Sequence, residues 1–312
     1  MESRFVEQEI KIPPLKRKKT TRRLTKMAIV ALAAFFLLCF FFGFWLAGFF
    51  YDPIFPQDKE ENPETVYKSR DVLNILIMGV DQREKGEPSR TDTLILAALD
   101  LDKKKVNLLS LPRDTRVEIP GKGVKRKINY SHAVGGVELT AKTVENFLKL
   151  PVHYYLETNF DGFTKAIDIL GGVTLNVEER MYLPLEGIDL QPGLQKLNGE
   201  DALSYVRWRG DGRGDIGRIE RQQKFFNALA TQAKKLSTVW KVPQLVTELS
   251  KQVKTDLDLQ RMIMLAIKFS DLENIEVKTY IVPGEADDVN YGGSYWIADE
   301  EELHKILKEI YG

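Results

Sequence analysis

The chain has 312 residues, of which 43% are hydrophobic, enough for one large domain or two small ones with a sizeable core. Its 45 Lys and Arg residues equal its 45 Asp and Glu residues; because the first 50 residues hold nine of the basic and three of the acidic ones, the remainder is net acidic. That balance excludes the broad basic face of a general nucleic-acid binder. The single cysteine, Cys39, excludes disulfides and thiolate metal sites, and the three histidines lack zinc-ligand spacing.

Residues 27–50, MAIVALAAFFLLCFFFGFWLAGFF, form an uncharged run of 24 residues. As a helix this run would span about 36 Å, more than the ~30 Å hydrocarbon core of a bilayer. A cleaved signal peptide would have an apolar region of only about 7–15 residues followed by small residues, whereas this run ends in bulky aromatic residues. We therefore expect an uncleaved transmembrane helix, or signal-anchor, over 27–50 rather than a signal peptide or a buried soluble helix.

The charges that flank this run predict its orientation. Eight basic residues and no acidic residue lie from Lys11 to Lys26, whereas acidic residues follow the run. Lys and Arg are enriched on the cytoplasmic side of membrane helices. The sequence therefore predicts a basic cytoplasmic tail over 1–26, an extracellular linker over 51–70 and an extracytoplasmic catalytic domain over 71–312, in a single-pass protein of the cell membrane. Cytosolic ATP is not available there, and the sequence holds no Walker-type phosphate loop.

Three apolar runs after residue 71 are typical of strands buried on both faces: 72–80, 93–99 and 105–111. The connections between them are too short for a crossover helix, so they predict an antiparallel meander. In a meander the end of the first strand, the start of the second and the end of the third lie at one edge of the sheet. We therefore expect Asp81, Asp92 and Arg113 to lie close together.

The remaining chain alternates helical and strand patterns. A helix is expected over 137–150, after Gly135-Gly136, and another over 160–170. Further helices are expected at 198–206, 219–236, within 242–269 and at 298–310, and further strands at 152–159, 173–177 and 275–282. We therefore expect an α/β domain whose central mixed, largely antiparallel β-sheet is flanked by helices on both faces, preceded by one transmembrane helix.

An arginine-rich segment follows the expected helix at 198–206. Arg207 and Arg209 are two apart, which in extended chain places both on one side. Arg218, Arg221 and Gln222 share a face on the first turns of the next expected helix, where backbone N–H groups attract anions. Such crowding costs a few tenths of a kcal/mol per charge, which a multivalent phosphate held bidentately by arginine would offset. The alternative is an ion-pair mesh with nearby acids, namely Asp211, Asp215 and Glu220.

Polar residues at the strand ends complete the candidate site. Asp81 and Asp92 form a candidate carboxylate pair for Mg²⁺, which prefers oxygen ligands and keeps several waters while it bridges substrate phosphates. Aspartates in loops are equally common as turn residues, so spacing alone leaves both interpretations open. Lys127 is a further candidate phosphate ligand or a solvated loop charge. Tyr130 and His132 have no assigned role.

The order and spacing of five motifs resemble the motif series of the LytR–CpsA–Psr family over about residues 70–236: RTDT (90–93), SLPRD (110–114), KINYSHAVGG (127–136), LNGEDALSYVRWR (197–209) and GRIERQQ (217–223). The resemblance implies a phosphotransferase of Gram-positive-type envelopes. Such enzymes move an anionic glycopolymer, a wall teichoic acid or capsule for example, from a polyprenyl-pyrophosphate carrier to a peptidoglycan hydroxyl, forming a phosphodiester. Beyond residue 236 the resemblance is weak.

The resemblance also implies roles for particular residues. Residues matching Asp81 and Asp92 hold Mg²⁺, or Mn²⁺ in its place. The pyrophosphate is bound by residues matching Arg90, Arg113, Arg207, Arg209, Arg218 and Gln222. Lys127 and Arg221 are further candidate pyrophosphate ligands because of their charge and their position in the sequence. We expect the catalytic contributions from Asp92, as acceptor of the hydroxyl proton, and from Arg113 and Arg207, which would neutralise the reacting phosphates.

Two other functions use the same residues. A pyrophosphohydrolase would take water as the acceptor, and a non-catalytic, membrane-anchored envelope regulator would bind the lipid without turnover. Under the transferase interpretation, the partners are the lipid-linked glycopolymer, peptidoglycan and, through one helix, membrane lipid, with no nucleic acid. An apolar channel for the polyprenyl chain is expected between helices, from 137–150 and 225–236.

Overall fold

The computed structural model describes residues 54, 72–81, 89–233, 242–269, 275–291 and 293–312. The predicted cytoplasmic tail, the predicted transmembrane helix over 27–50 and, except for Ile54, the predicted linker lie outside these residues. Within the described ranges, no helix is long and apolar enough to cross a membrane. The described structure therefore bears on the predicted outer domain.

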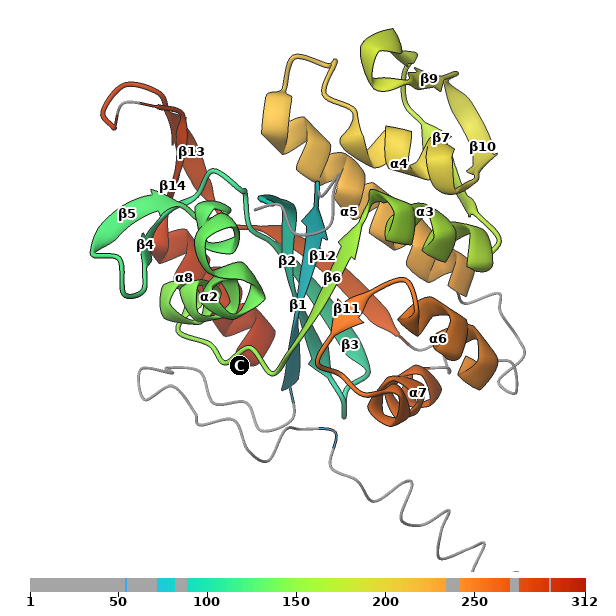
Figure 1. Ribbon diagram of the computed structural model, residues 1–312, viewed down its shortest axis with the longest axis horizontal. Helices are drawn as coiled ribbons and strands as arrows, with labels where there is room; N and C mark the ends of the chain where they lie inside the picture. Colours follow the sequence, from blue (N-terminus) through green and yellow to red (C-terminus); the bar gives the residue numbers. More distant parts are fainter. Residues whose placement is uncertain (1–53, 55–71, 82–88, 234–241, 270–274, 292) are drawn as a thin grey trace, which may run out of the picture. The chain divides into compact units, whose positions relative to one another are not determined.

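A six-stranded mixed sheet forms the centre of this domain, in the order β11-β6-β1-β2-β3-β12 (Figure 1). The three predicted apolar runs form its middle, and they pair antiparallel as a meander: β1 (Val72–Val80), β2 (Thr91–Asp100) and β3 (Lys105–Ser110). Two strands join in parallel, and a short one closes the edge antiparallel to β6: β6 (Tyr154–Asn159), β12 (Glu276–Ile281) and β11 (Lys254–Thr255). The predicted mixed, largely antiparallel sheet is confirmed.

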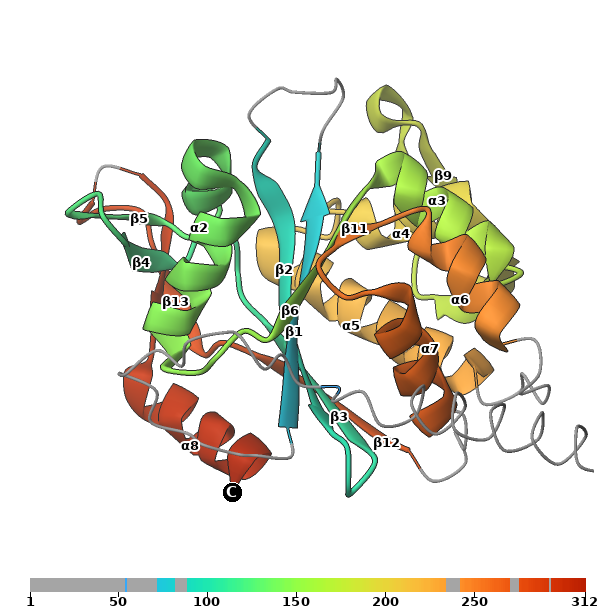
Figure 2. The same ribbon diagram turned by 60° about the horizontal axis from the view of Figure 1, so that its bottom comes forward.

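Helices cover both faces of the sheet (Figure 2). On one face, alternate strand residues such as Leu76 and Leu96 pack in one cluster with α2 (Tyr130–Leu148) and α8 (Glu300–Tyr311). On the other face, Ile95 and Ala97 pack against Phe226 of α5 (Gly214–Ala233), and Leu73 packs with α7 (Leu259–Lys268). Burial on both faces is the physical reason why these strands are almost continuously apolar.

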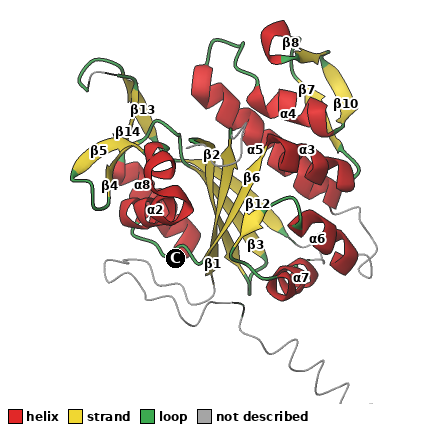
Figure 3. Cartoon of the chain, in the orientation of Figure 1, coloured by secondary structure: helices red, strands yellow, loops and turns green. Residues whose placement is uncertain are grey.

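A second core lies beside the sheet (Figure 3). Its helices are α3 (Phe160–Ile169) and α4 (Gly199–Arg207), and its strands form two hairpins: β7 (Val173–Val177) with β10 (Gly193–Leu197), and β8 (Met181–Leu183) with β9 (Ile188–Leu190), the latter two joined by the 3-10 turn η1 (Pro184–Glu186). Asparagine side chains cap both helices, because Asn159 accepts from the N–H of Gly162 and Asn198 from that of Asp201. These caps fix where α3 and α4 begin.

Two further hairpins and one helix were not predicted individually: β4 (Arg116–Ile119) with β5 (Val124–Lys127), β13 (Gly284–Asp287) with β14 (Tyr295–Ala298), and α6 (Val242–Ser250), which packs on α7. The strands are only four residues long, so their alternation is too short to distinguish them from loop.

Two predicted helix starts are wrong. Helix α2 begins at Tyr130 and continues across Gly136, whose φ of 61° and ψ of −154° kink the helix without ending it. Helix α5 begins at Gly214, earlier than the predicted residue 219. Arg218, Arg221 and Gln222 therefore lie beyond the first turn of α5. The free backbone N–H groups at the start of α5 were expected to attract an anion beside these three residues. This expectation does not hold for them, because the free N–H groups are confined to the first turn.

Candidate active site

One cavity of about 350 Å³ lies at the edge of the sheet where β1 ends and β2 begins. Asp81 follows β1, Asp92 is the second residue of β2, and Arg113 comes shortly after β3, and all three side chains line this cavity. The Arg113 Nη1 group donates to Asp92 Oδ1 at 2.5 Å. The predicted convergence of these residues is therefore confirmed, and it follows directly from the meander.

Three residues of the arginine-rich segment line the same cavity. Arg207 is the last residue of α4, Arg209 lies in the connection to α5, and Arg218 lies on α5. The side chain of Arg218 is only 3% exposed, and its Nη2 donates to the backbone carbonyl of Asp92 at 3.0 Å. Gln222, one turn further along α5, donates to Thr93 Oγ1 at 3.1 Å. Helix α5 thus brings distant sequence positions onto the start of β2.

Acidic residues hold these arginines in place. Asp215 Oδ1 lies 2.7 Å from Arg218 Nη2 and 3.5 Å from Arg113 Nε, and Glu186 Oε2 lies 3.2 Å from Arg207 Nη2. Burial raises the pKa of Asp215 above its ordinary 3.8, against the opposing charge of Arg113. For Arg113, burial lowers the pKa, but its hydrogen bond to Asp92 and the charge of Asp215 outweigh this effect, so the pKa is raised above its ordinary value.

The charges at the cavity balance in the absence of a ligand. Four guanidinium groups are matched by four carboxylates: Arg113, Arg207, Arg209 and Arg218 against Asp81, Asp92, Glu186 and Asp215. Buried Nε groups of Arg113 and Arg218 nevertheless have no hydrogen-bond partner among the described residues. A buried donor without a partner costs about 1–3 kcal/mol, so these two groups favour the binding of an anionic oxygen.

Three predicted pyrophosphate ligands do not line the cavity. Arg90 is exposed, and Lys127 Nζ lies 2.8 Å from Asp114 Oδ1 and above the ring of Tyr295. Arg221 points elsewhere, because its side chain is 2% exposed and donates to Asp211 Oδ2 at 2.6 Å. The structure therefore gives no support to a pyrophosphate contact from these three residues.

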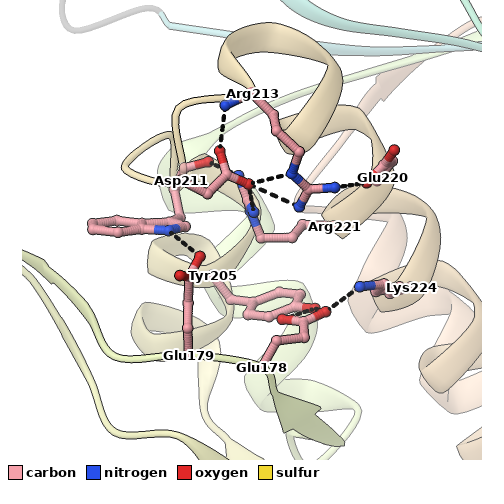
Figure 4. Close-up of polar contacts among 9 residues, drawn as sticks. Glu178, Glu179, Tyr205, Asp211, Arg213, Glu220, Arg221 and Lys224 are labelled. Carbon is pink, nitrogen blue, oxygen red and sulfur yellow. Dashed lines mark hydrogen bonds and ion pairs between the residues drawn. The ribbon is translucent and has the colours of Figure 1, made fainter.

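Arg221 instead belongs to an ion-pair mesh (Figure 4). Asp211 accepts from both Arg221 and Arg213, Arg213 also pairs with Glu220, and a second Arg221 nitrogen donates to the carbonyl of Trp208 at 2.7 Å. The hydrogen bond from Arg221 holds the pKa of Asp211 well below its ordinary 3.8. The ion-pair interpretation therefore holds for Arg213 and Arg221, whereas Arg207, Arg209 and Arg218 line the cavity.

Much of the cavity lining is apolar. Its aromatic and aliphatic side chains include Ile77, Phe160, Phe163, Leu203, Val206, Phe225 and Phe226. Phe226 also lines a second hollow of about 500 Å³, whose other residues are almost all apolar and come from the sheet, α5, α6 and α7. Of the two segments expected to line a lipid channel, the described part of 225–236 lines these two hollows, whereas 137–150 packs on the opposite face of the sheet.

Two residues at this site were not predicted as part of it. Asp215 was assigned only to the alternative ion-pair mesh, although its position within an arginine cluster was the available signal. Glu186 lies in the turn η1 between β8 and β9 and reaches Arg207 only because that hairpin folds over α4. A lone glutamate in a polar turn carries no signal of this kind in the sequence.

The sheet and the arginine-lined cavity at its edge contain the motifs of one protein family. Residues 51–311 match the LytR_cpsA_psr family, and the chain belongs to this family. The chain is 35% identical over 262 residues to the polyisoprenyl-teichoic acid–peptidoglycan teichoic acid transferase TagU of Oceanobacillus iheyensis, with 82% of this chain and 80% of that protein covered. It is 34% identical over 255 residues to TagU of Bacillus subtilis, covering 81% and 82%.

Solved structures agree with this assignment. The crystal structure of TagV from B. subtilis superposes with a TM-score of 0.68 at 32% identity, covering 78% of this chain and 97% of that one. A structure of TagT bound to LI-WTA superposes with a TM-score of 0.67 at 28% identity, covering 81% and 96%. The predicted family and fold class are confirmed.

Proposed function

We propose that this protein transfers an anionic glycopolymer of the teichoic acid class from a polyprenyl-pyrophosphate carrier to a hydroxyl group of peptidoglycan. The observation that carries this proposal is the cavity itself, which is lined both by four arginines and by several aromatic and aliphatic side chains. That combination fits a pyrophosphate that bears a hydrocarbon chain. The names of the relatives, polyisoprenyl-teichoic acid–peptidoglycan teichoic acid transferases, support the same substrate and acceptor.

The arginines would bind the pyrophosphate in the outer part of the cavity. Arginine presents a planar fork of donors that matches two phosphate oxygens at once, and Arg113 and Arg218 each keep a buried Nε without a hydrogen-bond partner in the described structure. The first isoprene units would then lie against Phe225 and Phe226, and the rest of the chain would continue into the apolar hollow beyond Phe226. Burial of this chain contributes about 25 cal/mol per Å² of apolar surface.

The residues present fit a bound Mg²⁺. Asp81 and Asp92 supply two carboxylates at the ends of neighbouring strands, and no group of three or more metal-ligating side chains exists among the residues that the structure describes. Two carboxylates are the usual protein contribution to Mg²⁺ when substrate phosphates complete its coordination. The balanced charge of the cavity supports this, because a disubstituted pyrophosphate brings two negative charges that a divalent cation would neutralise. The ion would supply charge neutralisation of the phosphate oxygens.

The protein's side chains would align and neutralise the reacting groups. The acceptor hydroxyl oxygen forms a bond to the phosphorus that carries the glycan, while the bond from this phosphorus to the bridging oxygen breaks and polyprenyl phosphate leaves. Arg113, Arg207 and Arg218 stabilise the charge on the phosphate oxygens, and Asp92 accepts the hydroxyl proton. The energy of the reaction is stored in the pyrophosphate, so no ATP is required outside the cell.

The proposal is tested with the full chain in mild detergent, a synthetic polyprenyl-pyrophosphate oligosaccharide and peptidoglycan oligomers. Release of polyprenyl phosphate is followed by chromatography, and attachment of the glycan by mass spectrometry. An adduct between glycan and peptidoglycan is the expected result. Release without an adduct would indicate a pyrophosphohydrolase, and binding without release would indicate a regulator, so either result would contradict the proposal.

Replacing Asp92 by asparagine is expected to lower the transfer rate by about 10²-fold or more and to raise the Mg²⁺ concentration needed for half-maximal activity. Asparagine keeps an oxygen for Arg113 but loses the negative charge and the capacity to accept a proton. Mg²⁺-dependent thermal stabilisation, measured without substrate, should weaken in the same variant. Asp102→Asn is the control, since Asp102 is exposed in the turn between β2 and β3, at the other edge of the sheet, and does not line the cavity. An equal loss of transfer rate in both variants would contradict the assignment of Asp92 to catalysis and Mg²⁺ binding.

Replacing Glu186 by glutamine is expected to lower the KM for the lipid-linked donor about two- to fivefold, because an exposed ion pair that competes for Arg207 is worth about 0.4–1 kcal/mol. Steady-state kinetics with varied donor measure this. The matched control is Asp189→Asn, since Asp189 lies on the same hairpin but pairs with Arg180. A higher KM in Glu186→Gln would mean that Glu186 binds substrate instead of competing with it.

A further inference from the structure

A buried histidine connects three parts of the domain behind the cavity. His132, in the first turn of α2, has a side chain that is 8% exposed. Its Nδ1 lies 2.7 Å from the backbone carbonyl oxygen of Ser89, and its Nε2 lies 3.0 Å from Oε2 of Glu157 on β6. Ser89 is itself buried and stands three residues before Asp92. The imidazole therefore ties α2 and β6 to the segment that enters β2.

These two contacts define the protonation state of the pair. The Ser89 hydroxyl oxygen also lies 3.5 Å from Nδ1, but the Ser89 carbonyl oxygen is closer, at 2.7 Å. This carbonyl and a carboxylate both only accept hydrogen bonds, so an ionised Glu157 requires that both ring nitrogens of His132 carry a proton. Burial lowers the pKa of His132, but the hydrogen bonds to Glu157 and Ser89 outweigh it and raise the pKa above 6.5. The hydrogen bond from His132 lowers the pKa of Glu157 below 4.5. The raised pKa of His132 and the lowered pKa of Glu157 both favour an imidazolium–carboxylate pair.

Few other charged groups face this pair. Lys254, directly opposite Glu157 on β11, has its Nζ 3.8 Å from Glu157 Oε1, but its side chain is 66% exposed. Its charge acts to lower the pKa of both His132 and Glu157. The charged side chains next to Ser89 and further along α2, Arg90 and Glu138, are exposed. The titration of His132 thus depends chiefly on Glu157 and on the carbonyl of Ser89.

The segment held by His132 carries groups of the active site. Thr91 is fully buried and pairs with Val80 at the end of β1, and the carbonyl of Asp92 accepts from Arg218. A shift of Ser89 would therefore be transmitted to Asp92 and to the start of β2. Misplacement of a reacting group by about 1 Å can cost roughly 10²-fold in rate.

We propose that His132 is a positioning residue of this active site, whose imidazolium form holds the Ser89 carbonyl and so fixes Asp92, and whose deprotonation releases that segment at alkaline pH. This inference rests on the proposed function, because one of its tests measures the transferase activity. Because the folded-state pKa of His132 is raised, its contribution is complete below 6.5 and is lost as the pH rises through the higher folded-state value.

Two isosteric substitutions separate the two contacts. In His132→Asn the amide nitrogen can replace Nδ1 and donate to Ser89, whereas in His132→Gln it can replace Nε2 and donate to Glu157. Both variants lose the same charge, and neither amide titrates. They therefore differ mainly in whether the Ser89 carbonyl keeps its donor. His304→Asn, at the exposed His304 on α8, is the control.

We expect His132→Asn to keep kcat/KM within a few-fold of the wild type near neutral pH, and His132→Gln to lose roughly 10–100-fold. The wild type should lose activity at pH values above about 7, and both variants should lack that decline, since the group that titrates is absent. Melting temperatures of the two variants should be similar. Equal activity of the two variants, or an alkaline decline that persists in both, would overturn the proposal.

Two readouts do not need turnover. The ring resonances of ¹³C-labelled histidine in the full chain should give a His132 pKa above 6.5, assigned by its absence in the His132 variants. The affinity for geranylgeranyl pyrophosphate, measured by calorimetry, should follow the order expected for kcat/KM. Wild type and His132→Asn should bind this lipid more tightly than His132→Gln does. If the wild type lacks transferase activity, the proposed function fails while these two results still decide the role of His132. A His132 pKa below 6.5 would contradict the inference directly.

Discussion

Replacing Arg207 by alanine is expected to lower kcat/KM by about 10²–10³-fold, equivalent to about 3–4 kcal/mol of transition-state stabilisation. Arg207 lies at the end of α4 and lines the cavity together with Asp92 and Arg113, and its side chain is 30% exposed. A donor held in advance at the place where phosphate charge develops stabilises the transition state without reorganisation. The rate of polyprenyl phosphate release, measured at varied donor concentration, gives this value.

The same substitution should leave the fold intact. In the structure Arg207 pairs with the exposed Glu186 and stacks over the ring of Phe160 at 4.7 Å. An exposed ion pair and an exposed cation–π contact each contribute only about 1 kcal/mol or less. We therefore expect the melting temperature to fall by no more than about 4–8 °C for the two contacts together, since ~1 kcal/mol shifts it by about 2–4 °C in a domain of this size. Arg207→Lys, which keeps the charge but loses the planar fork, should fall between wild type and alanine in rate.

Arg180 offers the matched control for Arg207. It is also a half-exposed arginine with a carboxylate partner, Asp189, and it lies over the ring of Tyr182 at 5.1 Å, but it does not line the cavity. Arg180→Ala should therefore have wild-type kinetics and a comparable melting temperature. If Arg207→Ala lost several kcal/mol of stability, or if Arg180→Ala lost as much activity, Arg207 would be a structural residue.

The sequence was sufficient to predict the sheet and one edge of the site. Long apolar runs and short connections define the meander β1–β2–β3, and the meander alone brings Asp81, Asp92 and Arg113 together, because antiparallel neighbours share an edge. The positions of β6 and β12 beside β1 and β3 depend on long-range packing, which no local pattern contains. The short hairpins were missed for a related reason, since four residues hold too little alternation to predict a strand.

The role of each arginine in the arginine-rich segment depends on its angular position around the helix axis. The spacing of residues in the sequence does not show which of these positions faces the cavity. Residues three apart on a helix differ by about 60° around its axis, and residues four apart by about 40° on the other side. On α5 this difference directs Arg218 and Gln222 to the cavity and Arg221 to Asp211. Whether a given arginine meets substrate or an acid also depended on the turn before α5, which holds Asp211 and whose path the sequence did not indicate.

Replacing Arg221 by alanine is expected to lower the free energy of unfolding by about 3–5 kcal/mol, the cost of removing one partner from a buried ion pair. The side chains of Arg221 and Asp211 are 2% and 7% exposed. Without Arg221, the carboxylate of Asp211 keeps only the exposed Arg213, and the buried carbonyl of Trp208 loses its donor. Urea denaturation of the full chain in detergent, followed by tryptophan fluorescence, measures this loss.

The pH dependence of stability provides a second measure of the same pair. Because Arg221 holds the pKa of Asp211 well below 3.8, the pair's contribution is present above 3.8 and is lost as the pH falls towards the lower folded-state value. The wild type should therefore lose stability in this acid range, and Arg221→Ala should lose less there, since its Asp211 has a pKa closer to the unfolded one.

Arg213→Ala is the control that decides whether burial or charge explains the effect of Arg221. Arg213 pairs with the same Asp211 and also with Glu220, but its side chain is 51% exposed, so its removal should cost no more than about 1 kcal/mol. Equal stability of Arg213→Ala and Arg221→Ala would show that the buried contact contributes nothing beyond an exposed ion pair. A larger loss in Arg221→Ala, with activity per folded molecule largely kept, would separate the arginine that holds the segment together from those that face the substrate.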